Sequence, residues 1–282
     1  MQKGIVTSNI SDLYKVETNN IVYNCNARGK FKAGEISPVA GDLVEVDITD
    51  ENKKVGVIEK ILERKNYIKR PKMANLTQII LVVSMKLPNT DLLLLDKQLV
   101  YAEYMYIKPI ICLNKIDLED EEKIEYIYNL YSKIGYTVIK TDAKNNVGVD
   151  QIKKYLQNNI TAFSGNSGVG KSTLINSILG KQIAEEGNIS SKNKRGKNTT
   201  TQVLLYKIGE NSYIADTPGF STFDISEIEK SDLAKYFIEF RPYLADCEYA
   251  DCSHKKEENC GIKRAVQEGK ISKDRYERFC EL

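Results

Sequence analysis

The first quarter of the chain alternates short apolar runs with polar turn residues. The apolar runs cover residues 4–7, 13–17, 21–25, 43–48 and 55–61. Runs of this length, bounded by turn residues, are typical of short strands. Five strands at this spacing predict a small closed barrel, and the OB-fold is the first candidate. An SH3-like barrel or a peptide-binding module fits the same pattern.

From about residue 71 the pattern changes to fully apolar runs separated by amphipathic segments. The runs 79–83, 110–113 and 160–163 predict buried strands, whereas 92–106 and 121–133 predict helices. Strands and helices that alternate in this way are typical of an α/β domain.

After about residue 222 only short helical patterns remain. They cover 233–240, 262–269 and 273–279. The chain is therefore predicted to be a multidomain α/β protein. Its parts are an OB-like β-barrel over 1–70, an α/β domain over 71–222 and a helical domain over 223–282.

Composition narrows the class of protein. Of the 282 residues 41% are hydrophobic, yet no long unbroken apolar run occurs and no apolar leader follows the first residues. We therefore expect a cytoplasmic protein with no membrane partner. The formal net charge of +2 does not by itself indicate nucleic-acid binding, so any basic surface must come from local clusters.

One stretch carries a phosphate-binding pattern. It reads Gly165, Asn166, Ser167, Gly168, Val169, Gly170, Lys171, Ser172, with Thr173 next. In a phosphate loop, G-x-x-x-x-G-K-[ST], backbone N–H groups cradle phosphates, the lysine reaches the β- and γ-phosphates and the serine hydroxyl binds Mg²⁺. A predicted strand precedes the loop and a predicted helix follows it, so the helix N-terminus faces the anion. A chance glycine turn would lack both neighbours.

Two further stretches identify the nucleotide. Asp216 begins the sequence Asp-Thr-Pro-Gly after an apolar run, where a carboxylate holds Mg²⁺ and the N–H of Gly219 lies near the γ-phosphate. The second stretch reads Asn114, Lys115, Ile116 and Asp117. A carboxylate at Asp117 accepts from guanine N1–H and N2–H₂, a pair of donors that adenine lacks. The sequence therefore predicts binding of GTP or GDP with Mg²⁺.

The C-terminal segment carries a metal-binding pattern. Its ligand candidates are Cys247, Cys252, His254 and Cys260. Three thiolates and one imidazole complete a tetrahedral zinc site with no open position, so one structural zinc ion is predicted. Buried cysteines without a metal are the alternative, but the surrounding residues are too polar for a core.

The order of these motifs is unusual. In an ordinary GTPase the phosphate loop precedes N-K-x-D, whereas here Asn114 precedes Gly165 and Asp216 comes last. A domain whose ends lie close together tolerates such a reconnection. In this order, in the spacing of the cysteines and in the barrel segment 38–46, the chain resembles the ribosome small-subunit-dependent GTPase A family of circularly permuted P-loop GTPases. The resemblance covers essentially the whole chain.

The resemblance implies a GTP hydrolase that binds the small (30S) ribosomal subunit late in its maturation, contacts 16S rRNA and leaves after hydrolysis. It implies that Ala143 lies at the guanine base, although Asp142 stands where a serine is usual. It also implies that Thr200, or as second choice Thr199, reaches Mg²⁺ and the γ-phosphate from the polar stretch 189–201. Nothing in the sequence demands more than a monomer.

Two positions depart from the family pattern. Asn198 replaces the usual histidine before the threonines, and Phe220 follows Gly219 where Ras-like enzymes have a water-positioning glutamine. Asn198 can orient water but cannot act as a base at neutral pH. Lys171, Asn198, Thr200 or Thr199, and Gly219 are therefore the predicted catalytic groups of an enzyme that is slow alone and stimulated by the ribosome. The alternative is a GTP-gated rRNA-binding switch with negligible hydrolysis.

Basic residues form clusters that fit RNA or simply a solvated surface. One cluster lies in the barrel, at Arg28, Lys30 and Lys32, and a second follows it at 64–72 together with Tyr67. The third belongs to the C-terminal helices and contains Lys263, Arg264, Lys270, Lys273, Arg275 and Arg278.

Overall fold

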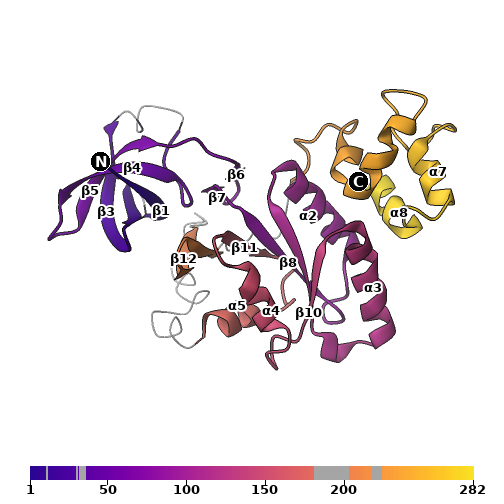
Figure 1. Cartoon of the computed structure of the whole chain (residues 1–282), viewed down its shortest axis with the longest axis horizontal. Coiled ribbons are helices and arrows are strands. Elements are labelled where there is room, and N and C mark those ends of the chain that lie inside the picture. Colours follow the sequence, from indigo (N-terminus) through magenta and orange to yellow (C-terminus); the bar gives the residue numbers. More distant parts are fainter. Residues whose placement is uncertain (11, 30, 32–35, 181–202, 217–223) are drawn as a thin grey trace. The chain divides into compact units, whose positions relative to one another are not determined.

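The computed structural model describes residues 1–10, 12–29, 31, 36–180, 203–216 and 224–282 (Figure 1). These residues group into two compact units, each built from segments that are distant in sequence. The first unit comprises the described residues within 1–78, 150–163 and 174–220, and the second comprises those within 79–149, 164–173 and 221–282.

The first unit contains the predicted five-stranded barrel. Its strands are β1 (Gln2–Ile10), β2 (Leu13–Thr18), β3 (Ile21–Ala27), β4 (Leu43–Asp50) and β5 (Val55–Ile61). They pair in the order β1-β2-β3-β5-β4, and β4 pairs again with β1, which closes the barrel. Alternate residues fill its interior: Val6, Tyr14, Val16, Tyr23, Cys25, Val44, Val46 and Ile58. The five predicted strands and the closed barrel are therefore confirmed, and each strand turns one face inward.

A short hairpin follows the barrel. It consists of β6 (Tyr67–Lys69) and β7 (Lys72–Ala74), which the sequence did not predict because each strand has only three residues in a basic stretch. Arg64 in front of it binds the buried Asp42 with two hydrogen bonds of 2.7 Å, and its guanidinium lies 4.7 Å from the ring centre of Tyr67. Arg64 therefore stabilises the barrel exit.

The first unit also contains three further strands and a helix. These are α4 (Val149–Tyr155), β11 (Ile160–Ser164), β12 (Leu204–Gly209) and β13 (Ser212–Asp216). The strand β13 runs parallel to β11 and antiparallel to β12. Buried residues along the whole of β11 confirm that its apolar run is a core strand.

The second unit contains β8 (Gln78–Ser84), β9 (Lys108–Asn114) and β10 (Thr137–Thr141), in the order β10-β9-β8. Two helices connect these strands, α2 (Leu92–Tyr104) and α3 (Glu121–Ile134), and the short helix α5 (Lys171–Leu179) begins here. Parallel strands joined by helices place the carboxyl ends of the strands at one edge of the sheet, where ligands bind in such folds.

The C-terminal segment of the second unit packs around phenylalanine rings. It comprises the 3₁₀ helices η3 (Leu233–Tyr236) and η4 (Ile238–Asp246) and the α-helices α7 (Gly261–Gln267) and α8 (Lys273–Glu281). Phe237, Phe240 and Phe279 lie within 5.0–5.2 Å of one another, ring centre to ring centre. Pro242 lies inside η4, and because proline lacks an N–H this region cannot form a regular α-helix.

Two of the C-terminal arginines do not face solvent. Arg275 is fully buried and Arg278 is mostly buried, and both bind Asp96 of α2. The interpretation that Arg275 and Arg278 face rRNA or water is therefore wrong, because their guanidinium groups form ion pairs inside the protein.

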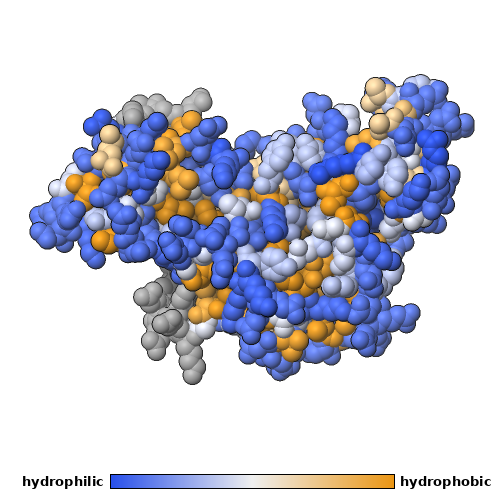
Figure 2. Space-filling model, viewed as in Figure 1, coloured by the Kyte–Doolittle hydropathy of each residue, from blue (hydrophilic) through white to orange (hydrophobic). Residues whose placement is uncertain are grey.

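Polar residues predominate on the face shown in Figure 2. Among the described residues, no helix is both long and apolar enough to cross a membrane.

Candidate functional site

The predicted phosphate loop lies between β11 and α5 and its backbone approaches its neighbours closely. Gly165 has φ +141°, and a Cβ there would lie 2.2 Å from the carbonyl oxygen of Val82 in β8. Gly170 has φ +101°, and a Cβ there would lie 2.3 Å from Nδ2 of Asn114. Only glycine fits these two positions, because a side chain would collide with β8 or with the guanine motif.

Lys171 is the first residue of α5, and its side chain folds back over the loop. Its Nζ donates to the carbonyl oxygens of Gly165 (2.7 Å) and Asn166 (2.8 Å). Burial lowers the pKa of this lysine. The ammonium group lies beside the positive end of a helix, so the loop is an electropositive place suited to phosphate. Ser167, Gly168, Ser172 and Thr173 are exposed around it.

Asn114 joins three segments of the site. Its Nδ2 donates to the carbonyl oxygen of Val169 in the phosphate loop (2.8 Å). Its Oδ1 accepts from the N–H of Ala143 and from the hydroxyl of Thr141, both at 3.1 Å. Asn114 is 2% exposed, so these are buried hydrogen bonds that would be costly to leave unmade. The motif thus holds the phosphate loop and the loop after β10 in one arrangement.

The rest of the N-K-x-D motif lies at the surface. Lys115 has the left-handed φ of +62°, and its Nζ donates to the carbonyl oxygens of Gly168 (2.7 Å) and Leu87. Ile116 begins a short 3₁₀ turn. Asp117 is exposed, and among the described residues its carboxylate has no hydrogen-bonding or ionic partner. An exposed carboxylate can accept hydrogen bonds from a pair of donors such as those that guanine offers.

The loop after β10 is held from within by Asp142. Its carboxylate accepts from the N–H groups of Lys144 (3.1 Å) and Asn145 (3.2 Å) and from the side chain of Asn145. Asp142 is therefore a turn-forming residue in place of the usual serine. The N–H of Ala143 already donates to Oδ1 of Asn114. To contact guanine, this N–H would have to donate to both acceptors or leave Asn114.

The four predicted zinc ligands converge. The sulfur atoms of Cys247, Cys252 and Cys260 and a ring nitrogen of His254 all lie within 4.8 Å of one another. Nδ1 of His254 lies 3.4 Å from two of the sulfurs, and Cys247 and Cys260 are 3.9 Å apart, sulfur to sulfur. Zinc–sulfur bonds of about 2.3 Å in a tetrahedron need sulfur separations of about 3.8 Å. The donor set and its spacing therefore fit Zn²⁺.

Neighbouring residues hold this cluster in place. The hydroxyl of Tyr276 donates to the carbonyl oxygen of His254 (2.7 Å), and the cluster lies against the ring of Phe279. Burial raises the pKa of the Cys252 thiol to about 12 and lowers the pKa of His254. Four protein ligands would leave a bound zinc ion no open position, which is the pattern of structural and not of catalytic zinc sites.

Comparison with known proteins places this chain. The model of the RsgA GTPase family matches residues 61–226, and that of the RsgA N-terminal domain matches residues 3–58. The chain belongs to the RsgA family. The small ribosomal subunit biogenesis GTPase RsgA of Alkaliphilus metalliredigens is 40% identical over 282 residues, covering 100% of this chain and 97% of that protein. RsgA of Clostridium botulinum is 44% identical over 276 residues, covering 97% and 94%.

Solved structures agree with the RsgA assignment. YjeQ from Thermotoga maritima has 37% identity and a TM-score of 0.85, covering 99% of this chain and 96% of its own. YloQ, described as a circularly permuted GTPase, has 32% identity and a TM-score of 0.83, covering 100% and 93%. The resemblance stated from the motifs is confirmed, and so are the barrel, the permuted GTPase domain and the C-terminal cysteine–histidine cluster.

Part of the predicted RsgA site lies outside the described residues. Asn198, Thr199, Thr200 and Gly219 belong to this part, as does Phe220. Asp216 ends β13 in the first unit, and burial raises the pKa of its carboxyl to about 6. The exposed hydroxyl of Ser172 and the carboxylate of Asp216 are oxygen ligands of the kind that Mg²⁺ prefers. The magnesium site stays a prediction.

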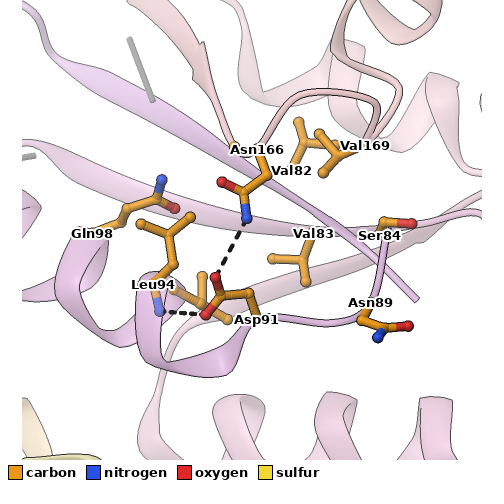
Figure 3. A pocket seen from close by; sticks show the side chains of 11 residues that line it. Val82, Val83, Ser84, Asn89, Asp91, Leu94, Gln98, Asn166 and Val169 are labelled. Carbon is orange, nitrogen blue, oxygen red and sulfur yellow. Dashed lines mark hydrogen bonds between the residues drawn. The ribbon is translucent and has the colours of Figure 1, made fainter. Parts of the chain in front are cut away.

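The structure adds residues that sequence reasoning missed. Asp91 caps α2 by accepting from the N–H of Leu94 (2.9 Å), and its other oxygen accepts from Asn166 of the phosphate loop (3.4 Å). Figure 3 shows these two contacts at the edge of a small pocket. Gln98 of α2 donates to the hydroxyl of Ser164 (3.2 Å). An aspartate before an apolar helical run can be recognised in the sequence as a helix cap. The contact of Asp91 with Asn166 could not be predicted, because the two residues are distant in sequence.

Proposed function

We propose that this chain is a GTP hydrolase that binds the small ribosomal subunit and assists its late maturation. In this proposal the subunit stimulates hydrolysis, and hydrolysis is coupled to release. The observation that carries it is the hydrogen bonding of Asn114, which joins the phosphate loop and the guanine motif into one buried arrangement. Membership of a family of small ribosomal subunit biogenesis GTPases supports the choice of partner.

The proposed roles follow the chemistry of each group. The backbone N–H groups of 165–173 and the ammonium of Lys171 bind phosphate oxygens, and Lys171 exchanges its two loop carbonyls for them. Asp117 accepts from guanine, and Asn114 with Lys115 holds the loop behind it. Ser172, Thr200 and Asp216 are proposed to hold Mg²⁺, which when bound neutralises charge on the β- and γ-phosphates.

Turnover by the isolated protein is expected to be slow. Phosphoryl transfer depends on positioning and on charge neutralisation, which the phosphate loop supplies. Asn198 can orient water by hydrogen bonding but cannot take its proton, and Phe220 offers no polar group. The proposed partner is therefore the small subunit with its 16S rRNA, acting on a cytoplasmic monomer. The cysteine–histidine centre is proposed to hold one structural zinc ion that stabilises the small C-terminal segment.

Phosphate release from GTP tests the proposal, measured at fixed salt with and without isolated small subunits. Small subunits are expected to accelerate release by about tenfold or more, which corresponds to about 1.4 kcal/mol or more of barrier. Large subunits are expected to have no effect. Lys171→Ala should abolish the activity, whereas Lys154→Ala, at an exposed lysine of α4, should not. Fast turnover that small subunits do not change would contradict the proposal.

A GTP-gated rRNA-binding switch is the second candidate, and the identities of Asn198 and Phe220 favour it. It predicts tight, GTP-dependent binding to the small subunit with no stimulated hydrolysis. If the absence of the family's usual histidine causes the lack of stimulated hydrolysis, Asn198→His should give hydrolysis that small subunits stimulate.

A further inference from the structure

The helix α2 has one face against the phosphate loop. Gln98, which is 2% exposed, donates to the hydroxyl of Ser164 directly before the loop. Asp91 at the start of the helix accepts from Asn166, the second residue of the loop. The helix and its N-cap therefore contact the start of the loop and the residue before it at two points that are seven positions apart, close to two helical turns.

The other side of α2 contacts the C-terminal segment that carries the cysteine–histidine centre. Asp96 is fully buried and binds both Arg275 and Arg278 of α8, and it accepts from the hydroxyl of Tyr131 (2.7 Å). Arg275 also pairs with Glu239 of η4. Each carboxylate oxygen of Asp96 has a cationic partner, whereas Nη2 of Arg278 is buried without a hydrogen-bonding partner among the described residues.

Further contacts extend along the same side of α2. Val100 belongs to the apolar cluster around Phe237, Phe240 and Phe279. Glu103 pairs with Arg241 (2.8 Å), and the rings of Tyr104 and Tyr236 meet edge to face at 5.5 Å. Buried ion pairs, an apolar cluster and ring contacts together make α2 and the C-terminal segment one packed body.

Packing on the two sides of α2 is unequal. On the side of the phosphate loop, a small pocket with a cavity volume of about 10 Å³ is lined by Ser84, Asp91 and Asn166 among others (Figure 3). Oγ of Ser84 is buried there and has no hydrogen-bonding partner among the described residues. The contact of Asn166 with Asp91 is long, at 3.4 Å. The polar contacts on the loop side are therefore long or missing, whereas Asp96 holds α8 through two close ion pairs.

We propose that α2 couples occupancy of the phosphate loop to the C-terminal segment. Gln98 and Asp91 are positioning residues for the loop, and Asp96 anchors the helix to α8. A ligand that orders 165–173 changes the two hydrogen bonds to α2, and the packed C-terminal segment moves with the helix. Because coupling acts in both directions between the two sites, a change at Asp96 that shifts the helix is expected to alter nucleotide affinity. The inference rests on the nucleotide binding in the proposed function and does not need stimulation by the ribosome.

Hydrogen exchange of residues 273–281 gives the first test, in the full zinc-loaded chain with and without GDP. In the wild-type chain GDP is expected to change the protection of α8. Gln98→Met keeps the volume and removes the donor to Ser164, so the response of α8 should be lost while GDP still binds. Lys97→Met is the matched control on the same helix, and its response should equal that of the wild type. An α8 that does not respond to saturating GDP in the wild-type chain overturns the coupling.

A double-mutant cycle gives the second test, with fluorescent GDP affinity as the readout. Asp96→Asn should change GDP affinity by about fivefold or more, although Asp96 contacts no residue of the phosphate loop. In the Gln98→Met background the same substitution should have an effect below about twofold. Zinc content and thermal unfolding monitor the fold, and Arg278→Gln replaces Asp96→Asn if the latter does not fold.

Equal effects of Asp96→Asn in both backgrounds would overturn the proposal. A wild-type chain that binds no GDP would instead overturn the proposed function, so the two failures are distinguishable.

Discussion

Replacing Asn114 by aspartate separates its two hydrogen-bonding roles. Asn114→Asp keeps an oxygen that accepts from Ala143 and Thr141. It removes the N–H that donates to the carbonyl oxygen of Val169 at 2.8 Å and places a negative charge against that oxygen. We therefore expect the guanine motif to detach from the phosphate loop while the β9–β10 side stays in place.

The expected size follows from the burial of Asn114. The lost neutral hydrogen bond contributes about 1 kcal/mol, and the buried carbonyl oxygen of Val169 left unpaired costs about 1–3 kcal/mol more, before any cost of the buried charge. Together these values predict a loss of about 2–4 kcal/mol, or about 30-fold to 700-fold in GDP affinity if the whole cost falls on the bound state. Thr141→Val removes only one donor to Asn114, so its loss should be about 0.5–1.5 kcal/mol.

Titration with a fluorescent GDP analogue measures these affinities, and thermal unfolding without nucleotide measures the share of the cost that falls on folding. Asn158→Asp, at an exposed turn position, is the matched control and should leave both quantities unchanged. The reasoning is refuted if Asn114→Asp binds GDP within about twofold of the wild type.

Three further outcomes are expected. Asp117→Asn should weaken GTP binding and favour xanthine nucleotides, which carry the complementary acceptor, and unchanged GTP affinity in a competition titration would overturn the guanine assignment. Cys260→Ser should lower the zinc content measured by atomic absorption from one ion per chain and reduce thermal stability, since a thiolate ligand is lost; retention of one tightly bound ion would argue against this centre. Gly170→Ala should abolish GDP binding because its Cβ would lie 2.3 Å from Nδ2 of Asn114. Gly180→Ala, where a Cβ meets nothing within 4 Å, should bind GDP normally, and equal behaviour of the two variants would contradict the packing argument.

The motifs of this chain could be predicted because each is local. The phosphate loop spans Gly165 to Ser172, and the zinc candidates lie within Cys247 to Cys260. Over such distances the backbone geometry follows from glycine positions, turns and helix starts, so spacing along the chain determines spacing in the site. The barrel strands were predicted for the same reason, since short apolar runs bounded by turn residues mark strands locally.

The roles of polar side chains could not be predicted in this way. Arg275 resembles any basic residue of an exposed helix in sequence, yet it is buried against Asp96, which lies 179 positions away. Asp142 departs from the family pattern, and only its contacts with Lys144 and Asn145 explain the change. Charge and residue type do not say which partner a side chain will meet.

The sequence alone determined the GTPase family and predicted the cysteine–histidine cluster that the structure brings together, because these depend on short patterns in a fixed order. The tertiary structure decided that Asn114 holds the phosphate loop from behind and that α2 lies between this loop and the C-terminal segment. The physical reason is that buried hydrogen bonds and ion pairs join strands and helices that are distant in sequence. Packing in three dimensions decides which groups become partners, and a local sequence pattern does not reveal that packing.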